Sequence, residues 1–106
     1  MIALKDKSLL KSQCLVDGRW IDAADGKTID VTNPADGSLV GTVPSLSVDT
    51  IKEAINASNK ALPSWAGKTA KERAGILRKW FDLIVANADD IALIMTSEQG
   101  KPLAEA

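Results

Sequence analysis

The sequence predicts an α/β chain in which two N-terminal β-hairpin arms are followed by three amphipathic α-helices and the start of a fourth. Over residues 1–46, short runs of alternating hydrophobic and polar residues are separated by turn dipeptides. Over residues 47–106, hydrophobic residues recur every three or four positions, the period of a helix that buries one face. The length of 106 residues allows one domain at most.

The composition excludes several classes of function. Lys and Arg number 13 and Asp and Glu number 14, so the net charge of -1 creates no field that attracts nucleic acid or an anionic membrane. The chain has no His and one Cys, Cys14, which excludes His-dependent triads, Cys-rich zinc sites and an internal disulfide. We therefore expect a reduced thiol and a cytoplasmic location. Charges interrupt residues 1–11 every few positions, so no signal peptide or membrane span is expected there.

The first hairpin is predicted at residues 13–23. Asp17-Gly18 lies between two runs that carry hydrophobic residues, and this dipeptide favours a type I′ turn because both central residues need positive φ. A two-residue turn places Leu15 opposite Trp20, with Cys14 opposite Ile21 on the other face. Both faces of the hairpin are then partly hydrophobic, so it needs cover on both sides.

The second hairpin is predicted from residues 28–32 and 39–43. Ile29 and Val31 alternate with polar residues, and the segment 33–37 between the runs contains Pro34, which favours a chain reversal. Two hairpins provide too few strands for an independent sheet, so we expect them to be arms that lie on other parts of the fold.

The first helix is predicted to begin after Ser47, which can cap it, and Pro63 is expected to end or kink it. The segment 62–67 is expected to connect this helix to the next, with Trp65 packed between helices. The hydrophobic stripe of the first helix consists of Val48, Ile51, Ala54, Ile55, Ala61 and Leu62.

The second helix is predicted to begin at a capping box formed by Thr69 and Glu72. Its predicted hydrophobic stripe consists of Ile76, Leu77, Trp80, Leu83, Ile84 and Ala88. A third helix is expected from Asp89 or Asp90 to Gly100, a residue that readily adopts the left-handed conformation at a helix end. Pro102 would then open a fourth helix that has room only for residues 102–106. A helix this short is stable only when it packs against other residues. The chain is therefore expected to be a fragment of a longer protein.

Five segments occur in a recognisable order: VDGRWIDA, DVTNPADGSLVGTVP, a helix ending in ALPSW, TAKERAGILRKWFDLI and MTSEQGKPLAEA. In this order and at this spacing they resemble the N-terminal part of the aldehyde dehydrogenase superfamily, from Val16 to Ala106. The segments ALPSWAGKTAKERAGILRKWF and EQGKPLAEA most resemble the bacterial succinate-semialdehyde dehydrogenases.

The resemblance implies that residues 1–106 form the N-terminal part of an NAD(P)-binding domain within the aldehyde dehydrogenase fold. Residues 1–46 would be extended hairpin arms, residues 47–106 outer helices, and the catalytic domain would be absent. The full-length enzyme would oxidise succinate semialdehyde to succinate with NADP or NAD and would be a homo-oligomer. In the family a Cys thiolate attacks the aldehyde, hydride passes to the cofactor and a Glu activates water. These residues all lie beyond Ala106, so no catalytic or cofactor-binding residue is assigned and the fragment itself is expected to be inactive.

The resemblance also implies a site for a monovalent cation. Relatives hold the ion with backbone carbonyls near the Asn-Pro turn and one acidic side chain, a donor set that suits a hard cation. Carried over to this chain, the ligands are the carbonyls of Val31 and Thr32 and the carboxylate of Glu98. Many relatives have Asp at the position of Glu98. The alternative is that Glu98 and Lys101 are ordinary charged residues at a helix end.

For the Cys and Trp residues the sequence favours structural roles over catalytic or ligand-binding roles. Cys14 has no His or helix start nearby to activate it, which favours a small strand residue over a nucleophile. Trp20, Trp65 and Trp80 are predicted to pack in the core or between helices rather than to stack on bases or nicotinamide. An alternative for the whole chain is a stand-alone, non-catalytic oligomerisation or interaction module of the same fold, which would bind partners through exposed hydrophobic helix faces.

Overall fold

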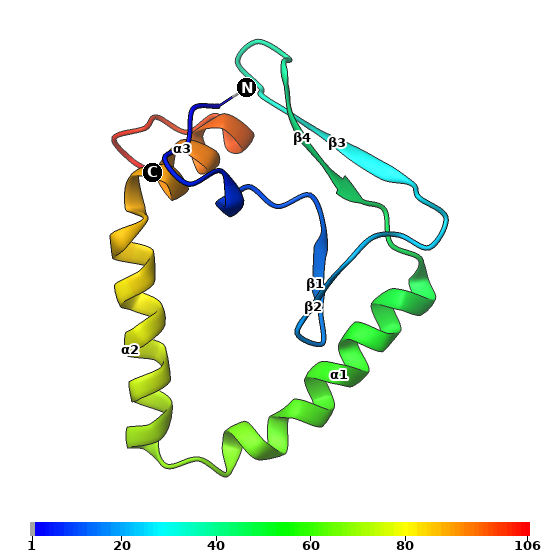
Figure 1. Ribbon diagram of the computed structural model, residues 1–106, viewed down its shortest axis with the longest axis vertical. Coiled ribbons are helices and arrows are strands. Elements are labelled where there is room, and N and C mark those ends of the chain that lie inside the picture. Colours follow the sequence, from blue (N-terminus) through cyan, green and yellow to red (C-terminus); the bar gives the residue numbers. More distant parts are fainter. Residues whose placement is uncertain (1) are drawn as a thin grey trace.

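The computed structural model describes residues 2–106 and shows two hairpins followed by three helices (Figure 1). A short 3-10 turn, η1 (Lys7–Leu9), precedes the first strand and was not predicted. The strands are β1 (Cys14–Val16), β2 (Arg19–Ile21), β3 (Thr28–Thr32) and β4 (Leu39–Pro44), and the helices are α1 (Val48–Ala66), α2 (Ala70–Ala86) and α3 (Ala88–Gln99). The two-hairpin, three-helix order agrees with the sequence prediction.

The first hairpin has the predicted register, with Leu15 opposite Trp20 and Cys14 opposite Ile21. Asp17 and Gly18 have φ values of 51° and 73°, as a type I′ turn requires. The second hairpin is antiparallel as well, and Asn33 opens its turn by donating its amide to the carbonyl of Ser38 at 2.8 Å. Local turn chemistry therefore determined both hairpins.

The helix starts also agree with the prediction. The Ser47 hydroxyl accepts the amide of Thr50 at 3.2 Å at the start of α1. At the start of α2, the Thr69 hydroxyl accepts the amide of Glu72 at 3.2 Å, and the Glu72 carboxylate accepts the amide of Thr69 at 2.8 Å. This is the predicted capping box.

Of the two effects predicted for Pro63, ending the helix is wrong. Helix α1 continues through Pro63 to Ala66, so residues 62–66 are helical and not a connector. Pro63 removes one amide donor, but its carbonyl still accepts the amide of Gly67 at 2.9 Å, which allows the last turn to close. Trp65 is half-buried beside Leu62 of its own helix rather than packed between helices.

Two further boundaries differ from the prediction. Helix α3 begins at Ala88, one residue before the earlier of the two predicted starts, so Ala88 does not belong to the stripe of α2. The predicted fourth helix is only a turn, in which Glu105 donates its amide to the carbonyl of Pro102 at 2.9 Å. A segment of five residues forms too few helical hydrogen bonds to offset the cost of nucleation.

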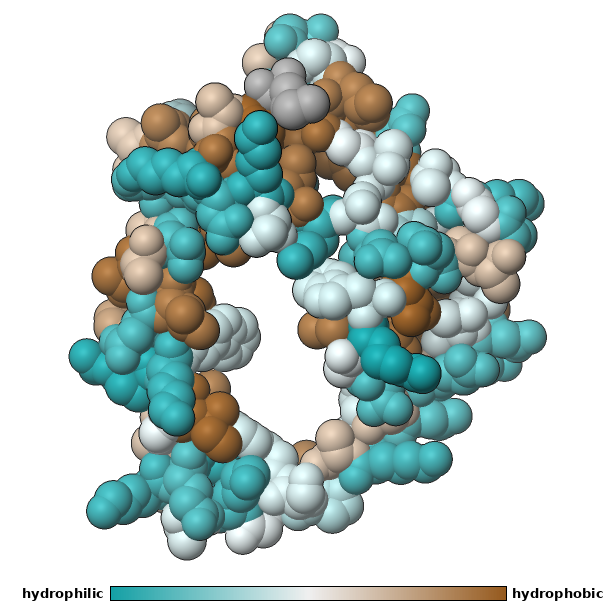
Figure 2. Space-filling model, viewed as in Figure 1, coloured by the Kyte–Doolittle hydropathy of each residue, from teal (hydrophilic) through white to brown (hydrophobic). Residues whose placement is uncertain are grey.

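The described residues contain very little hydrophobic core. Leu4 and Ala23 are the buried hydrophobic residues, whereas Trp80, Leu83 and Ile84 of α2 are 63%, 64% and 44% exposed. The radius of gyration is 16.6 Å, whereas a compact chain of this length has about 13 Å. The accessible surface is 8093 Å², whereas a compact protein of this size exposes about 5,700 Å². Helices α1 and α2 border an opening through the molecule, with hydrophobic residues along its edge (Figure 2).

None of the helices in residues 2–106 is long and apolar enough to cross a membrane.

Candidate functional site

The proposed cation ligands lie on two elements that the fold brings together. Val31 and Thr32 are the last two residues of β3, and Glu98 lies in the last turn of α3. Helix α3 packs against β3, although more than 50 residues of chain separate them, so the ends of both elements meet at the β3–β4 turn (Figure 1).

The backbone is irregular at the two carbonyl positions. Val31 pairs with Gly41 but Thr32 pairs with Leu39, so Val40 is the extra residue of a β-bulge. A bulge disrupts the ladder locally and changes the direction of the strand. The turn that follows is held by Asn33, whose side-chain oxygen accepts the amide of Ala35 at 2.9 Å and whose carbonyl accepts the amide of Gly37 at 2.7 Å.

The C-terminal end of α3 lies directly on this turn. Gly100 has a φ of 82°, and its amide donates to the carbonyl of Thr96 at 2.9 Å, which closes the helix as predicted. A Cβ atom added to Gly100 would lie 2.7 Å from Cγ of Pro34. The sequence predicted the left-handed conformation of Gly100 but not this close approach, which depends on how two distant segments meet.

The donor set fits a monovalent hard cation. Carbonyl and carboxylate oxygens are the ligands that such ions prefer, and a single carboxylate balances a single charge. Glu98 is exposed, and no hydrogen bond or ion pair among residues 2–106 involves its carboxylate. Nearby in α3, the hydroxyl oxygen of Thr96 is buried and has no hydrogen-bond partner among the described residues. Within the same residues, no three His, Cys, Asp or Glu side chains gather as a multi-ligand metal site requires.

The remaining candidates lie elsewhere. Cys14 is a free, half-buried thiol in β1. The three Trp residues occupy β2, α1 and α2, so they do not form one stacking surface. No described element covers Trp20, which is 45% exposed, or Trp80, which is 63% exposed, so their predicted packing is not met within residues 2–106.

A group of polar contacts at the other end of α3 was not predicted. The Asp90 carboxylate accepts the backbone amides of Lys5 and Asp6, and Lys5 Nζ lies 2.7 Å from Oδ2 of Asp89. The hydrogen bond and charge of Asp89 raise the pKa of Lys5, and Lys5 in turn lowers the pKa of Asp89. These partners are more than 80 positions apart, so no local sequence pattern could reveal them.

Comparisons of the sequence with a family model and with individual proteins agree on one family. Residues 20–106 match the model of the aldehyde dehydrogenase family. The chain is 54% identical over 103 residues to the NADP(+) succinate-semialdehyde dehydrogenase of Escherichia coli K12. It is 55% identical over 103 residues to the glutarate-semialdehyde dehydrogenase of Pseudomonas aeruginosa. Each match covers 97% of this chain and 21% of the relative, so the chain spans about a fifth of the length of these proteins.

Solved structures agree with this comparison. An aldehyde dehydrogenase from Brucella melitensis biovar abortus 2308 matches with a TM-score of 0.94 and 87% identity, over 99% of this chain and 22% of that one. An NADP-dependent enzyme of E. coli matches with a TM-score of 0.92 and 53% identity, over 97% of this chain and 21% of that one. The open arrangement of hairpins and helices is thus that of the corresponding part of larger proteins.

Proposed function

Because the chain belongs to the aldehyde dehydrogenase family, we propose that it is the N-terminal part of an enzyme that oxidises succinate semialdehyde to succinate. In the overall reaction the aldehyde carbon gives a hydride to NAD or NADP, water supplies the second oxygen, and two protons are released as the new carboxylate forms. Glutarate semialdehyde is an equally supported substrate, because the relative named for it is as similar as the one named for succinate semialdehyde. In both alternatives the product is a dicarboxylic acid and the cofactor is NAD or NADP.

The role of residues 1–106 in that enzyme is structural support of the NAD(P)-binding domain. The observation that carries this proposal is the exposed surface of 8093 Å², which exceeds that of a compact protein of this size by about 2,400 Å². An exposed excess of this size is as large as the surface that obligate interfaces bury, which indicates that other residues cover it. The Ile76 to Ile84 stripe of α2 and the segment Ile91 to Met95 of α3 would cover the nucleotide-binding sheet, which the remaining residues of the enzyme would form.

Residues 2–106 contain no turn of the kind that binds a dinucleotide cofactor. A dinucleotide pyrophosphate binds where a glycine-rich turn joins a strand to the start of a helix. In the described residues, Gly67 precedes α2 but follows another helix, and the turn glycines of the hairpins connect strands. We therefore assign no cofactor-binding residue to this chain, and we propose that the catalytic residues lie in the remaining part of the enzyme. The complete enzyme is proposed to be a homo-oligomer in the cytoplasm.

A monovalent cation at the β3–β4 turn is part of the proposal. The carbonyls of Val31 and Thr32 and the carboxylate of Glu98 would hold it. Bound there, the ion would neutralise Glu98 and join the end of α3 to the end of β3. The bulge beside Thr32 and the contact between Gly100 and Pro34 support this placement.

The activity is tested with the full-length enzyme and with residues 1–106 alone. Both are assayed for NADH or NADPH formation with succinate semialdehyde and with glutarate semialdehyde. We expect turnover by the enzyme, with the higher of the two kcat/KM values identifying its substrate, and none by residues 1–106. Turnover by residues 1–106 alone would show that the chemistry does not lie in the remaining residues, and oxidation of neither aldehyde would exclude both substrates.

The cation site is tested by thermal unfolding of the full-length enzyme in sodium, potassium or tetramethylammonium chloride at constant ionic strength. We expect sodium or potassium to raise the Tm and Glu98→Gln to abolish that increase. Glu105→Gln is the matched control, since Glu105 is another exposed acidic residue, in the C-terminal turn. Equal cation dependence in the parent and in Glu98→Gln would contradict the assignment of Glu98.

A further inference from the structure

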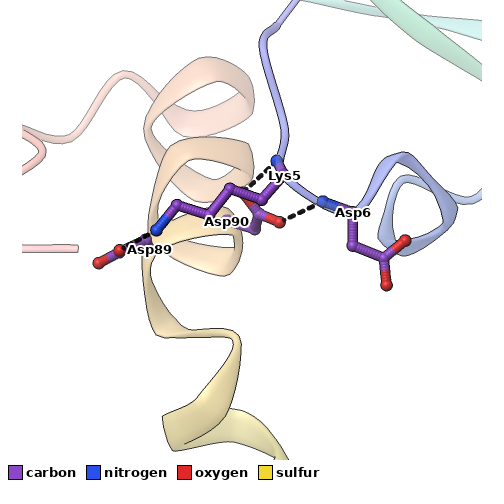
Figure 3. A network of polar contacts seen from close by, with 4 residues as sticks. All are labelled: Lys5, Asp6, Asp89 and Asp90. Atoms are coloured by element: carbon purple, nitrogen blue, oxygen red, sulfur yellow. Dashed lines mark hydrogen bonds and ion pairs between the residues drawn. The ribbon is translucent and has the colours of Figure 1, made fainter.

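Asp90 is a buried carboxylate, only 4% exposed, at the N-terminal end of α3. Its Oδ1 accepts the backbone amide of Lys5 at 2.9 Å and its Oδ2 accepts that of Asp6 at 2.8 Å (Figure 3). Hydrogen bonds to an ionised acceptor are roughly twice as strong as neutral ones. The carboxylate therefore binds the backbone of the N-terminal segment and makes no use of the side chains of Lys5 and Asp6.

Helix α3 has no side-chain cap, and these bonds do not supply one, because they satisfy amides of residues 5 and 6 and not amides of the helix itself. Its N-cap residue, Asn87, makes no capping bond, and its side-chain amide nitrogen donates instead to the carbonyl of Leu83 in α2 at 2.9 Å. Asp90 is the third residue of α3, where a carboxylate often completes a capping box. Here both of its oxygens bind residues 5 and 6 instead, so the N-terminal segment holds this end of the helix.

The opposite end of α3 is held by a different contact. Gly100 lies against Pro34, so closely that a Cβ atom would overlap the proline ring. Asp90 and Glu98 are eight residues apart, about 12 Å along a helix. A helix of this length moves as a rigid rod, so a displacement at Asp90 also displaces Glu98.

We propose that Asp90 is a positioning residue: by binding the backbone of residues 5 and 6, it sets the position of the C-terminal end of α3 on the β3–β4 turn. In the enzyme it thereby determines how close the Glu98 carboxylate lies to the carbonyls of Val31 and Thr32. This second step rests on the proposed cation site. The neighbouring ion pair of Lys5 with Asp89 contributes little, since both side chains are about 80% exposed.

The proposal is tested in the full-length enzyme with Asp90→Asn and its matched control Asp89→Asn. Both variants remove one negative charge from the first turn of α3, but only the first replaces an acceptor oxygen with a donor facing a backbone amide. Asp90→Glu is a third variant, since it keeps both acceptor oxygens. Two quantities are measured: the sodium or potassium concentration that gives half of the increase in Tm, and hydrogen exchange in peptides covering residues 28–34 and 96–101.

We expect Asp90→Asn to raise the half-effective cation concentration by about fivefold or more and to speed exchange in both peptides. Asp89→Asn should change neither quantity, and Asp90→Glu should change both by less than Asp90→Asn does. A lower Tm in Asp90→Asn with the parent cation response and parent exchange rates would overturn the proposal, because Asp90 would then be merely structural. If the parent enzyme shows no cation response, the cation site fails, and exchange alone decides: faster exchange at residues 96–101 supports the positioning role, and unchanged exchange overturns it.

Discussion

Replacing Gly100 with Ala tests the contact that brings α3 onto the β3–β4 turn. Two separate costs are expected. The φ of 82° is a conformation that side chains rarely adopt, and it costs an L-residue about 1–2 kcal/mol. In addition, the new Cβ would lie 2.7 Å from Cγ of Pro34, whereas carbon atoms pack at about 3.5–4.0 Å. Forcing the two segments apart by such a distance costs about 1–3 kcal/mol, so Gly100→Ala should destabilise the protein by about 2–5 kcal/mol.

Gly37→Ala separates the two costs. Gly37 has a nearly identical φ of 74°, but its added Cβ would meet nothing within 4 Å. It should therefore show only the conformational cost of about 1–2 kcal/mol. Pro34→Ala removes the atoms that the new methyl group would strike, so the double variant of Gly100→Ala with Pro34→Ala should be less destabilised than the two single changes predict together.

The assay is urea unfolding of the full-length enzyme and of each variant, followed by circular dichroism. Equal losses for Gly100→Ala and Gly37→Ala, together with additive effects in the double variant, would refute the reasoning. That result would mean that α3 does not touch Pro34. The proposed cation site would then lose one of the two observations that support it.

Three smaller effects are expected from the same structure. Thr69→Ala removes one half of the capping box and should cost about 1 kcal/mol in unfolding free energy, whereas Thr69→Ser should cost little. Gly75→Ala should stabilise the protein by up to about 1 kcal/mol in the same unfolding assay, since Gly75 lies inside α2 and an added Cβ meets nothing within 4 Å. The hydroxyl and amide of Ser38 lower the pKa of Asp36, so an NMR titration of Ser38→Ala should show that pKa rising toward its ordinary value. A carboxyl group with a lowered pKa stabilises the folded state at pH values above its ordinary pKa. That stabilisation is lost as the pH falls through the folded-state pKa, so Ser38→Ala should lose less stability in acid than the parent protein.

The hairpins and helix starts could be predicted because their causes lie within a few residues. Asp17-Gly18 has the backbone freedom that a type I′ turn needs, and it produced the predicted register of β1 and β2. Thr69 and Glu72 are three positions apart, so their capping box depends only on the first turn of α2. Pro63 shows the limit of such rules, since α1 accommodates it in its last turns.

The candidate site could be predicted only in part. Resemblance to relatives identified Val31, Thr32 and Glu98, and the structure places them on two elements that meet at one turn. Their occupation by a cation stays a prediction. Asp90 was missed because its partners, the amides of Lys5 and Asp6, are present in any sequence and carry no pattern of their own.

Residues close together in the chain specify the turns, the helix caps and most element boundaries, since hydrogen bonds and steric limits among near neighbours decide these features. Three other features appear only when the chain is folded: Asp90 holds the N-terminal segment, Gly100 lies on Pro34, and the hydrophobic face of α2 remains uncovered by residues 2–106. The residues that make the first two contacts lie more than 60 positions apart in the chain. Such contacts depend on where separate elements meet in space.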